Sequence, residues 1–250
     1  MSEKQHFETK YFDDIDTISE NDNYFLPVLK DVASAIDIKT AKVLDVGCGT
    51  GLFMSPLIKW GCTEMYGVDG PTDCADRAIK RGYKEVKFVN DLCVDRLPYD
   101  DNSFDLIVCK DVFEHLLDPV HSLKEINRVL KTGGHLLLHV PNHFPFYGRL
   151  KFLFTNNLDT FSFFPGSSRW EFPHIRFYEH ADSIKLLGKE GFSLDRDLSI
   201  HFPVIPVLVR FSFFKSFCRS LVAKYPNQFA GGFTFLLRKN NNGPAAAQQN

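Results

Sequence analysis

The stretch VLDVGCGTG, residues 43–51, decides how this chain folds. A short apolar run rich in valine leads into three glycines at the alternate positions 47, 49 and 51. Because glycine has no Cβ, a ligand can lie against bare backbone there and the turn can use positive φ angles. The amides of such a turn, with the start of the next helix, favour a negatively charged group. The sequence therefore predicts a strand, a binding turn and a helix, at the strand end where open α/β sheets bind ligands.

The remaining pattern alternates short β-rich runs with helical periodicity, which favours a parallel sheet covered on both faces. Strands are predicted at residues 42–46, 64–68, 86–89, 104–109, 135–140, 192–199 and 232–238. Helices are predicted at residues 24–36, 52–60, 73–81, 120–130 and 179–190.

Composition places the chain among ordinary soluble proteins, since 44% of its 250 residues are hydrophobic and 24% are charged. The net charge of −2 gives no basic excess, so no nucleic-acid partner is expected. The first thirty residues are polar, and no apolar run reaches the ~18 residues that span a bilayer. The six cysteines form no Cys-x-x-Cys pair and show no zinc spacing, which favours reduced thiols and a cytoplasmic location.

Phenylalanine is distributed unevenly along the chain, since 18 of the 25 phenylalanines lie between Phe144 and Phe235. Regular periodicity fails over residues 142–173, which are too aromatic and too long for a plain connection and are expected to form an inserted cap. We expect an N-terminal segment at 1–23, one domain at 24–238 that includes an apolar helical segment at 203–224, and a disordered tail at 239–250.

The spacing of the glycine turn separates two classes of nucleotide-binding protein. The dinucleotide pattern G-x-G-x-x-G would need glycine at position 52, where the chain has leucine. The chain instead has G-x-G-x-G preceded by Asp45, followed by YGVDG at 66–70 and by NDL at 90–92. With DNSFDLIVCKDVFEHLLDP (101–119) and LKEINRVLKTGGHLLLHVPN (123–142), it resembles the class I, Rossmann-like S-adenosylmethionine-dependent methyltransferases, in the small-molecule, ubiquinone-biosynthesis-like branch.

This resemblance implies a seven-stranded, mostly parallel sheet whose last strand is antiparallel, and S-adenosylmethionine as the cofactor. It also implies that Asp69 accepts hydrogen bonds from the ribose hydroxyls, a role for which a carboxylate is suited. Asp91 would lie against the adenine amino group, and Lys110 with Asp111 near the sulfonium. The full set of implied cofactor residues is Asp45, Gly47, Cys48, Gly49, Gly51, Asp69, Gly70, Asp91, Leu92, Lys110 and Asp111.

Methylation of an oxygen or nitrogen atom can require a base, and two histidines are candidates. His143 follows the predicted fifth strand, and His174 lies in FPHIRFYEH, where related methyltransferases often have a histidine. The alternative is catalysis by positioning alone, without a protein base. Residues 111–115, DVFEH, are similar to an E-x-x-E-H metal motif of a few relatives, but the first position is aspartate and we expect no metal.

By analogy, the expected reaction is methyl transfer, with O-methylation favoured, to a small-molecule, saccharide or lipid-linked acceptor. A non-catalytic S-adenosylmethionine sensor or partner activator is the alternative from another class, and a nicotinamide-dependent oxidoreductase is a third. Basic residues beside an apolar helical face at 207–224 are compatible with peripheral membrane contact through 203–224, and equally with a core helix. The sequence carries no indication of oligomeric state.

Overall fold

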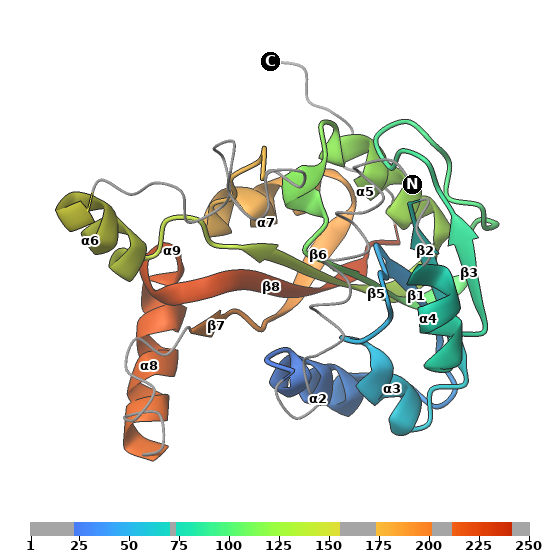
Figure 1. Cartoon of the computed structure of the whole chain (residues 1–250), viewed down its shortest axis with the longest axis horizontal. Coiled ribbons are helices and arrows are strands. Elements are labelled where there is room, and N and C mark those ends of the chain that lie inside the picture. The colour runs from blue at the N-terminus through green and yellow to red at the C-terminus, as the bar shows by residue number, and fades with distance from the viewer. Residues whose placement is uncertain (1–22, 71–73, 156–173, 202–211, 242–250) are drawn as a thin grey trace.

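The computed structural model describes residues 23–70, 74–155, 174–201 and 212–241, and every structural statement below concerns these residues (Figure 1). The first half contains α2 (Leu26–Ala35), β1 (Lys42–Val46), α3 (Ser55–Lys59), β2 (Glu64–Asp69), α4 (Cys74–Lys80), β3 (Glu85–Phe88), β4 (Phe104–Lys110), η2 (Phe113–His115) and α5 (Pro119–Val129). The second half contains β5 (Leu130–Pro141), α6 (Phe146–Thr155), α7 (His180–Lys189), β6 (Phe192–Asp197), β7 (Ile200–His201), α8 (Ser212–Lys224), α9 (Pro226–Phe229) and β8 (Ala230–Lys239).

Seven strands follow one path through the sheet, in the order β3-β2-β1-β4-β5-β8-β6, and the short β7 pairs with β8 beside it. The pairs β3–β2, β2–β1, β1–β4 and β4–β5 are parallel, whereas β8 is antiparallel to both β5 and β6. The predicted Rossmann-like sheet with an antiparallel last strand is therefore confirmed. The strand order reverses at β1–β4, which makes the carboxyl ends of these strands the expected ligand-binding edge.

Two hydrophobic clusters cover the two faces of the sheet, because successive side chains of a strand point to opposite faces. Ile107 and Cys109 of β4 pack in the cluster that includes side chains of α5 and α7. Leu106 and Val108 pack in the other cluster, with side chains of α2 and α3. Figure 1 shows the same arrangement, with α5 and α7 on one side of the sheet and α2 and α3 on the other. Complete burial of each such side chain contributes about 1.5–3 kcal/mol.

The helix α5 illustrates how local sequence sets these elements. The Asp118 side chain accepts hydrogen bonds from the backbone amides of Val120 (3.0 Å) and His121 (3.2 Å), and Pro119 occupies the first helical position. No helix in the described part of the chain has both the length and the apolar character needed to cross a membrane.

Periodicity located most elements to within a few residues, but three features differ from expectation. The strand predicted at 135–140 begins at Leu130, because the residues after α5 already pair with β4. The first part of the predicted cap forms the helix α6, and residues 156–173 of that cap lie outside the described residues. The short elements β7 and α9 were not predicted, since two and four residues are too few for a period to be read.

Candidate functional site

Strand register gathers the predicted cofactor residues along one edge of the sheet. Val46 of β1 pairs with Val68 of β2 and with Cys109 of β4. Because these strands are parallel, the residues that follow them meet at the same edge. Gly47 therefore lies between the ends of β2 and β4, next to Asp69 and Lys110.

The glycine turn needs bare backbone at two positions. Gly47 has a φ of +74°, and a Cβ there would lie 2.3 Å from Cγ2 of Val112. Gly51 has a φ of +76°, and its Cβ would lie 2.7 Å from the ring of Tyr83. Any other residue would meet both backbone strain and a collision, so the turn keeps its shape only with glycine.

Asp69 holds the turn against the end of β2. One carboxylate oxygen accepts a hydrogen bond from the Gly49 amide, and the other accepts one from the Gly70 amide at 2.7 Å. A carboxylate can accept about four hydrogen bonds, which suits it to bind more than one donor. A Cβ built on Gly70 would meet no described atom within 4 Å.

Asp45 lies beneath the turn and is buried. Its carboxylate accepts a hydrogen bond of 2.7 Å from the hydroxyl of Tyr83. Burial raises the pKa of Asp45 to about 7, against the lowering effect of that hydrogen bond. Burial also raises the pKa of the Cys48 thiol, whose Sγ packs against Gly67, and this disfavours the nucleophilic thiolate form. All six cysteines are free thiols, as the sequence predicts.

Asp91 and Leu92 lie on the loop after β3. The Asp91 carboxylate is exposed and accepts a hydrogen bond of 2.7 Å from the Cys93 amide, while Leu92 packs against the core. Asp91 therefore shapes its own turn on this loop.

At the end of β4, the buried Lys110 forms an ion pair with the partly exposed Asp111. The Lys110 ammonium lies 3.8 Å from the ring centre of Phe53 and 4.9 Å from that of Tyr24. Burial lowers its pKa, but the charges of Asp111 and Tyr24 and the hydrogen bonds with both together outweigh burial and raise it. Asp111 also accepts a hydrogen bond of 3.2 Å from the Tyr24 hydroxyl and lies 3.4 Å from Nε2 of His139. Although burial opposes ionisation, Lys110 lowers the pKa of Asp111 to about 2. Tyr24 and His139 were missed because only the folded chain brings them to β4.

The two predicted base candidates lie in direct contact. Nε2 of His143 is 2.8 Å from Nδ1 of His174. The amides of Ile175 (2.8 Å) and Arg176 (3.1 Å) both bond to the backbone carbonyl of Glu114, which fixes the chain beside His174. Burial first, and then the charge of His174, lowers the pKa of His143 to about 3. His143 is therefore neutral near pH 7 and serves as a hydrogen-bond partner that orients the ring of His174.

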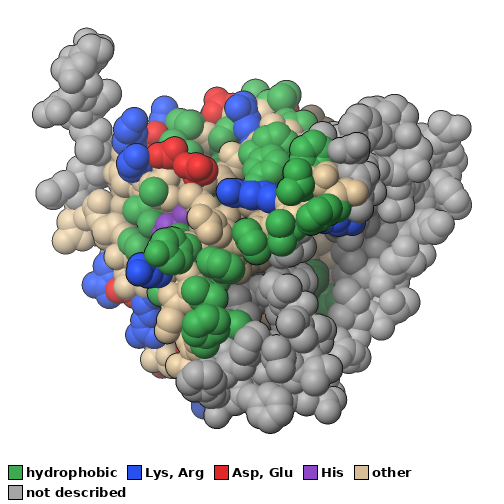
Figure 2. Space-filling view, turned by 90° about the vertical axis from the view of Figure 1, so that its left-hand side faces the viewer, with side chains coloured by type: hydrophobic (Ala, Val, Ile, Leu, Met, Phe, Trp, Pro, Cys, Tyr) green, Lys and Arg blue, Asp and Glu red, His purple; other side chains and the backbone are tan. Residues whose placement is uncertain are grey.

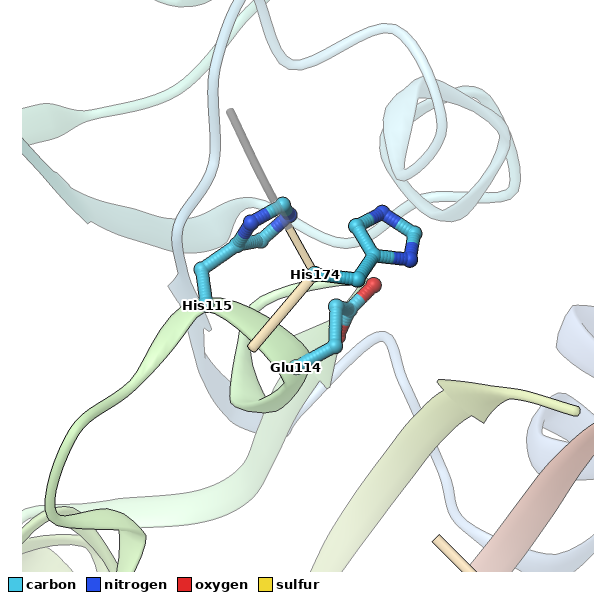
Figure 3. Close-up of side chains that lie close together, drawn as sticks. All are labelled: Glu114, His115 and His174. Carbon is cyan, nitrogen blue, oxygen red and sulfur yellow. The ribbon is translucent and has the colours of Figure 1, made fainter. Parts of the chain in front are cut away.

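Glu114 and His115 complete this cluster, as Figure 3 shows. Ligand atoms of Glu114, His115 and His174 all lie within 4.8 Å of one another. Glu114 is fully buried, and neither of its carboxylate oxygens has a hydrogen-bond partner among the described residues. Burial, and then the charge of Asp111, raises its pKa to about 8, so the group is protonated near pH 7. Sequence spacing identified Glu114 and His115 as a pair, but gave no sign that His174 joins them.

A separate cavity opens at the opposite edge of the sheet. It has a volume of about 520 Å³, and its lining includes Lys42 at the start of β1 and Glu85 at the start of β3. Its charged side chains largely pair with one another, as Arg128 does with Asp101 at 2.8 Å. The cavity therefore contributes nothing to the site at the carboxyl edge.

Comparison with known proteins agrees with this geometry. Residues 44–138 match the family described as methyltransferase domain. These residues are therefore similar to a methyltransferase domain. The chain is 34% identical over 116 residues to a ubiquinone biosynthesis O-methyltransferase of Coxiella burnetii, a match that covers 46% of this chain and 49% of that protein. The chain thus spans about half the length of the curated relatives that it matches.

Solved structures show the same fold over nearly the whole chain. A chain from the complex of the Haloferax volcanii Trm112 methyltransferase activator with a methyltransferase matches with a TM-score of 0.64 and 20% identity, covering 96% of this chain and all of that one. An S-adenosylmethionine-dependent methyltransferase from Mesorhizobium loti matches with a TM-score of 0.56 and 16% identity, covering 86% and 97%. The resemblance to class I S-adenosylmethionine-dependent methyltransferases is therefore confirmed, in the matched domain and in the fold.

The residues present fit the cofactor of this family. The turn at Gly47 offers backbone that no side chain could replace, and Asp69 holds this turn at the end of β2. Lys110 lies at the same edge, where the resemblance implies a position near the sulfonium. Its ammonium lies against aromatic rings and Asp111, which limits its repulsion of a sulfonium.

Proposed function

We propose that the chain is an S-adenosylmethionine-dependent methyltransferase that methylates an oxygen atom of a small-molecule, saccharide or lipid-linked acceptor. The observation that carries this proposal is the pairing of the glycine turn with Asp69, next to a histidine pair at the same sheet edge. The ubiquinone biosynthesis O-methyltransferases support O-methylation of a small molecule, although they match over only half their length.

The chain's own residues would bind and orient the cofactor, which supplies an electrophilic methyl group when bound. Asp69 accepts hydrogen bonds from the ribose hydroxyls, since a carboxylate can accept about four. The glycine turn runs along the methionine end, Lys110 with Asp111 lies near the sulfonium, and Asp91 with Leu92 contacts the adenine. Asp45 acts indirectly, because its hydrogen bond with Tyr83 fixes β1, the strand that leads into the turn.

His174 receives the proton that the acceptor hydroxyl loses. The contact between His143 and His174 needs one donor nitrogen and one acceptor nitrogen, so the two rings share a single hydrogen between them. When Nδ1 of His174 donates that hydrogen, Nε2 of the neutral His174 ring has the lone pair that can accept the proton of the acceptor hydroxyl. Because His143 stays neutral, it orients His174 without adding a competing charge. General-base assistance of this kind contributes typically about 10²–10⁴-fold to a rate.

A divalent cation held by Glu114, His115 and His174 is the second candidate for activating the acceptor. The observation in its favour is the buried Glu114 carboxyl, whose oxygens have no partner among the described residues. Such an ion would ionise Glu114 and lower the pKa of a hydroxyl bound to it. We keep the expectation of no metal as the first choice, because a protonated Glu114 also explains its burial.

The experiment that tests this proposal measures S-adenosylhomocysteine formation with a panel of phenolic, sugar and lipid-linked hydroxyl acceptors. Turnover that survives chelation and is lost in His174→Ala supports the base, whereas turnover restored only by a divalent ion supports the metal. Cofactor binding without turnover on any acceptor would favour the sensor. The cytoplasmic location, the expected lack of a nucleic-acid partner and the membrane contact through 203–224 stay predictions.

A further inference from the structure

The helix α6 exposes most of its apolar side chains. Phe154 is 80% exposed and Leu153 is 69% exposed, and Phe152, Leu150 and Phe146 are also exposed. An isolated helix of ten residues is marginal in water, and most helical stability in proteins comes from burying an apolar face. Monomeric proteins seldom expose contiguous apolar patches without using them for binding. The exposed apolar side chains of α6 are therefore a candidate binding surface.

Contacts connect α6 to neighbouring exposed residues. The ring centres of Phe146 and Phe229 lie 6.1 Å apart, and those of Phe229 and Tyr225 lie 6.5 Å apart, which links α6 to the end of α8. Before α6, the half-exposed rings of Phe144 and Phe177 lie 5.5 Å apart. We call the exposed side chains of residues 144–154, with Phe177, Phe217 and Tyr225, the aromatic face. Figure 2 looks onto this end of the molecule and shows hydrophobic side chains with Lys and Arg among them.

Charge on these segments has a single sign. Residues 144–154 contain Arg149 and Lys151 and no acidic residue, and residues 216–224 contain Arg219 and Lys224 and no acidic residue. The whole chain has a net charge of −2, so the rest of the chain carries −6. In Figure 2 the Asp and Glu side chains lie mainly in the upper left part of the view, beside Lys and Arg side chains. Apolar rings beside basic residues match an anionic bilayer, in which the rings enter the acyl boundary and the cations face the headgroups.

A second copy of the chain fits this face less well. In a symmetric dimer the same patch faces itself, so Arg149 and Lys151 of one subunit would meet the same cations of the other. The basic residues lie on both α6 and α8, which favours a broad anionic surface over a compact acidic pocket.

We propose that the aromatic face docks the protein onto an anionic lipid bilayer. The half-exposed Phe177 links this face to the candidate site, because its ring centre lies 4.8 Å from that of His143. If the proposed methyl transfer holds, an acceptor carried in the same membrane would reach His174 without crossing bulk water. Membrane docking itself does not depend on catalysis.

Vesicle sedimentation without cofactor tests this proposal separately from methyl transfer. The test variant is Leu153→Glu with Phe154→Glu, and the control of equal charge is Ile79→Glu with Phe88→Glu, two exposed residues on α4 and β3. We expect binding to vesicles of phosphatidylcholine mixed with phosphatidylglycerol, at least tenfold weaker binding to pure phosphatidylcholine, and loss of both in the test variant only. Arg149→Gln and Lys224→Gln should each weaken binding to the anionic vesicles about fivefold.

Circular dichroism of each variant would verify that it folds like the wild type. Failure of the wild type to sediment with anionic vesicles, or equal binding by the test variant, would overturn the proposal. The wild type could instead form a concentration-dependent dimer that Leu153→Glu abolishes, and show no vesicle binding. That result would assign the aromatic face to a second copy of the chain and would also overturn the proposal.

Discussion

His143 and His174 lie 31 residues apart in the chain, yet Nε2 of the first is 2.8 Å from Nδ1 of the second. His143 stands just after β5, where the sheet fixes its backbone. His174 is held from the other side by the bonds of Ile175 and Arg176 to the Glu114 carbonyl, and Tyr178 donates a further hydrogen bond of 3.0 Å to the Phe113 carbonyl. The pair is therefore anchored by two independent parts of the fold.

His174→Ala should lower kcat about 10²–10⁴-fold, because the acceptor hydroxyl loses its base. His143→Ala should lower kcat less, since His174 remains but is no longer oriented. Neither change should alter the affinity for S-adenosylmethionine, measured by calorimetry. Unchanged kcat in both variants would mean that positioning alone drives the reaction.

Asp69→Ala should weaken cofactor binding by about 1.5–3 kcal/mol, the range for hydrogen bonds to a charged group. Asp182→Ala provides a control, because it removes a carboxylate from an exposed surface pair with Lys185. Calorimetric titration of both variants with S-adenosylhomocysteine measures the difference. Equal affinities in the two variants would remove Asp69 from the site.

Gly47→Ala should destabilise the fold and abolish cofactor binding, because its Cβ would collide with Val112 at a positive φ. Adding Val112→Ala removes the colliding methyl group and should restore part of the stability, while backbone strain of about 1 kcal/mol remains. Thermal unfolding of the single and double variants measures this coupling. Additive effects of the two changes would show that the collision does not limit this position.

Lys110→Met should destabilise the protein by about 3 kcal/mol, the lower part of the range for breaking a buried ion pair. Asp111 is partly exposed and keeps its contacts with Tyr24 and His139, which softens the loss. The double variant Lys110→Met, Asp111→Asn should recover much of the stability in urea unfolding, because no buried charge remains alone. A double variant no more stable than the single one would contradict this reasoning.

Glu114→Gln should change how stability depends on pH. The pKa of Glu114 is about 8 in the folded protein, against an ordinary value of 4.5. Between these values the folded state keeps a proton that the unfolded state has lost, so this group makes the free energy of unfolding fall as pH rises. The slope approaches about 1.4 kcal/mol per pH unit within that window.

The glutamine of the variant does not titrate, so its free energy of unfolding lacks this dependence on pH. The stability of the variant relative to the wild type should therefore increase from pH 5 to pH 8. Urea unfolding at several pH values measures the difference. A constant difference across this range would show that Glu114 is ionised in the folded state. A metal ion bound at Glu114 would produce the same constant difference, and unfolding with a chelator would distinguish the two cases.

Sequence reasoning predicted the sheet and its glycine turn because local period and glycine spacing determine them. It named His143 and His174 separately, but it could not predict their contact. That contact depends on the hydrogen bonds that Ile175 and Arg176 make with the Glu114 carbonyl. It missed Tyr24 and Tyr83 for the same reason. The hydroxyl of Tyr24 donates to Asp111, 87 residues away, and that of Tyr83 donates to Asp45, 38 residues away. It described residues 142–173 as irregular, although α6 is helical there, because a helix with its apolar side chains exposed shows no amphipathic period.

Titration of the protein with S-adenosylmethionine and, separately, with NAD measures most directly what the glycine turn binds. We predict binding of one S-adenosylmethionine per chain, weakened at least tenfold in Asp69→Ala, and no binding of NAD. Binding of NAD alone, or S-adenosylmethionine affinity that is indifferent to Asp69, would contradict the assignment of the turn as a methyl-donor site.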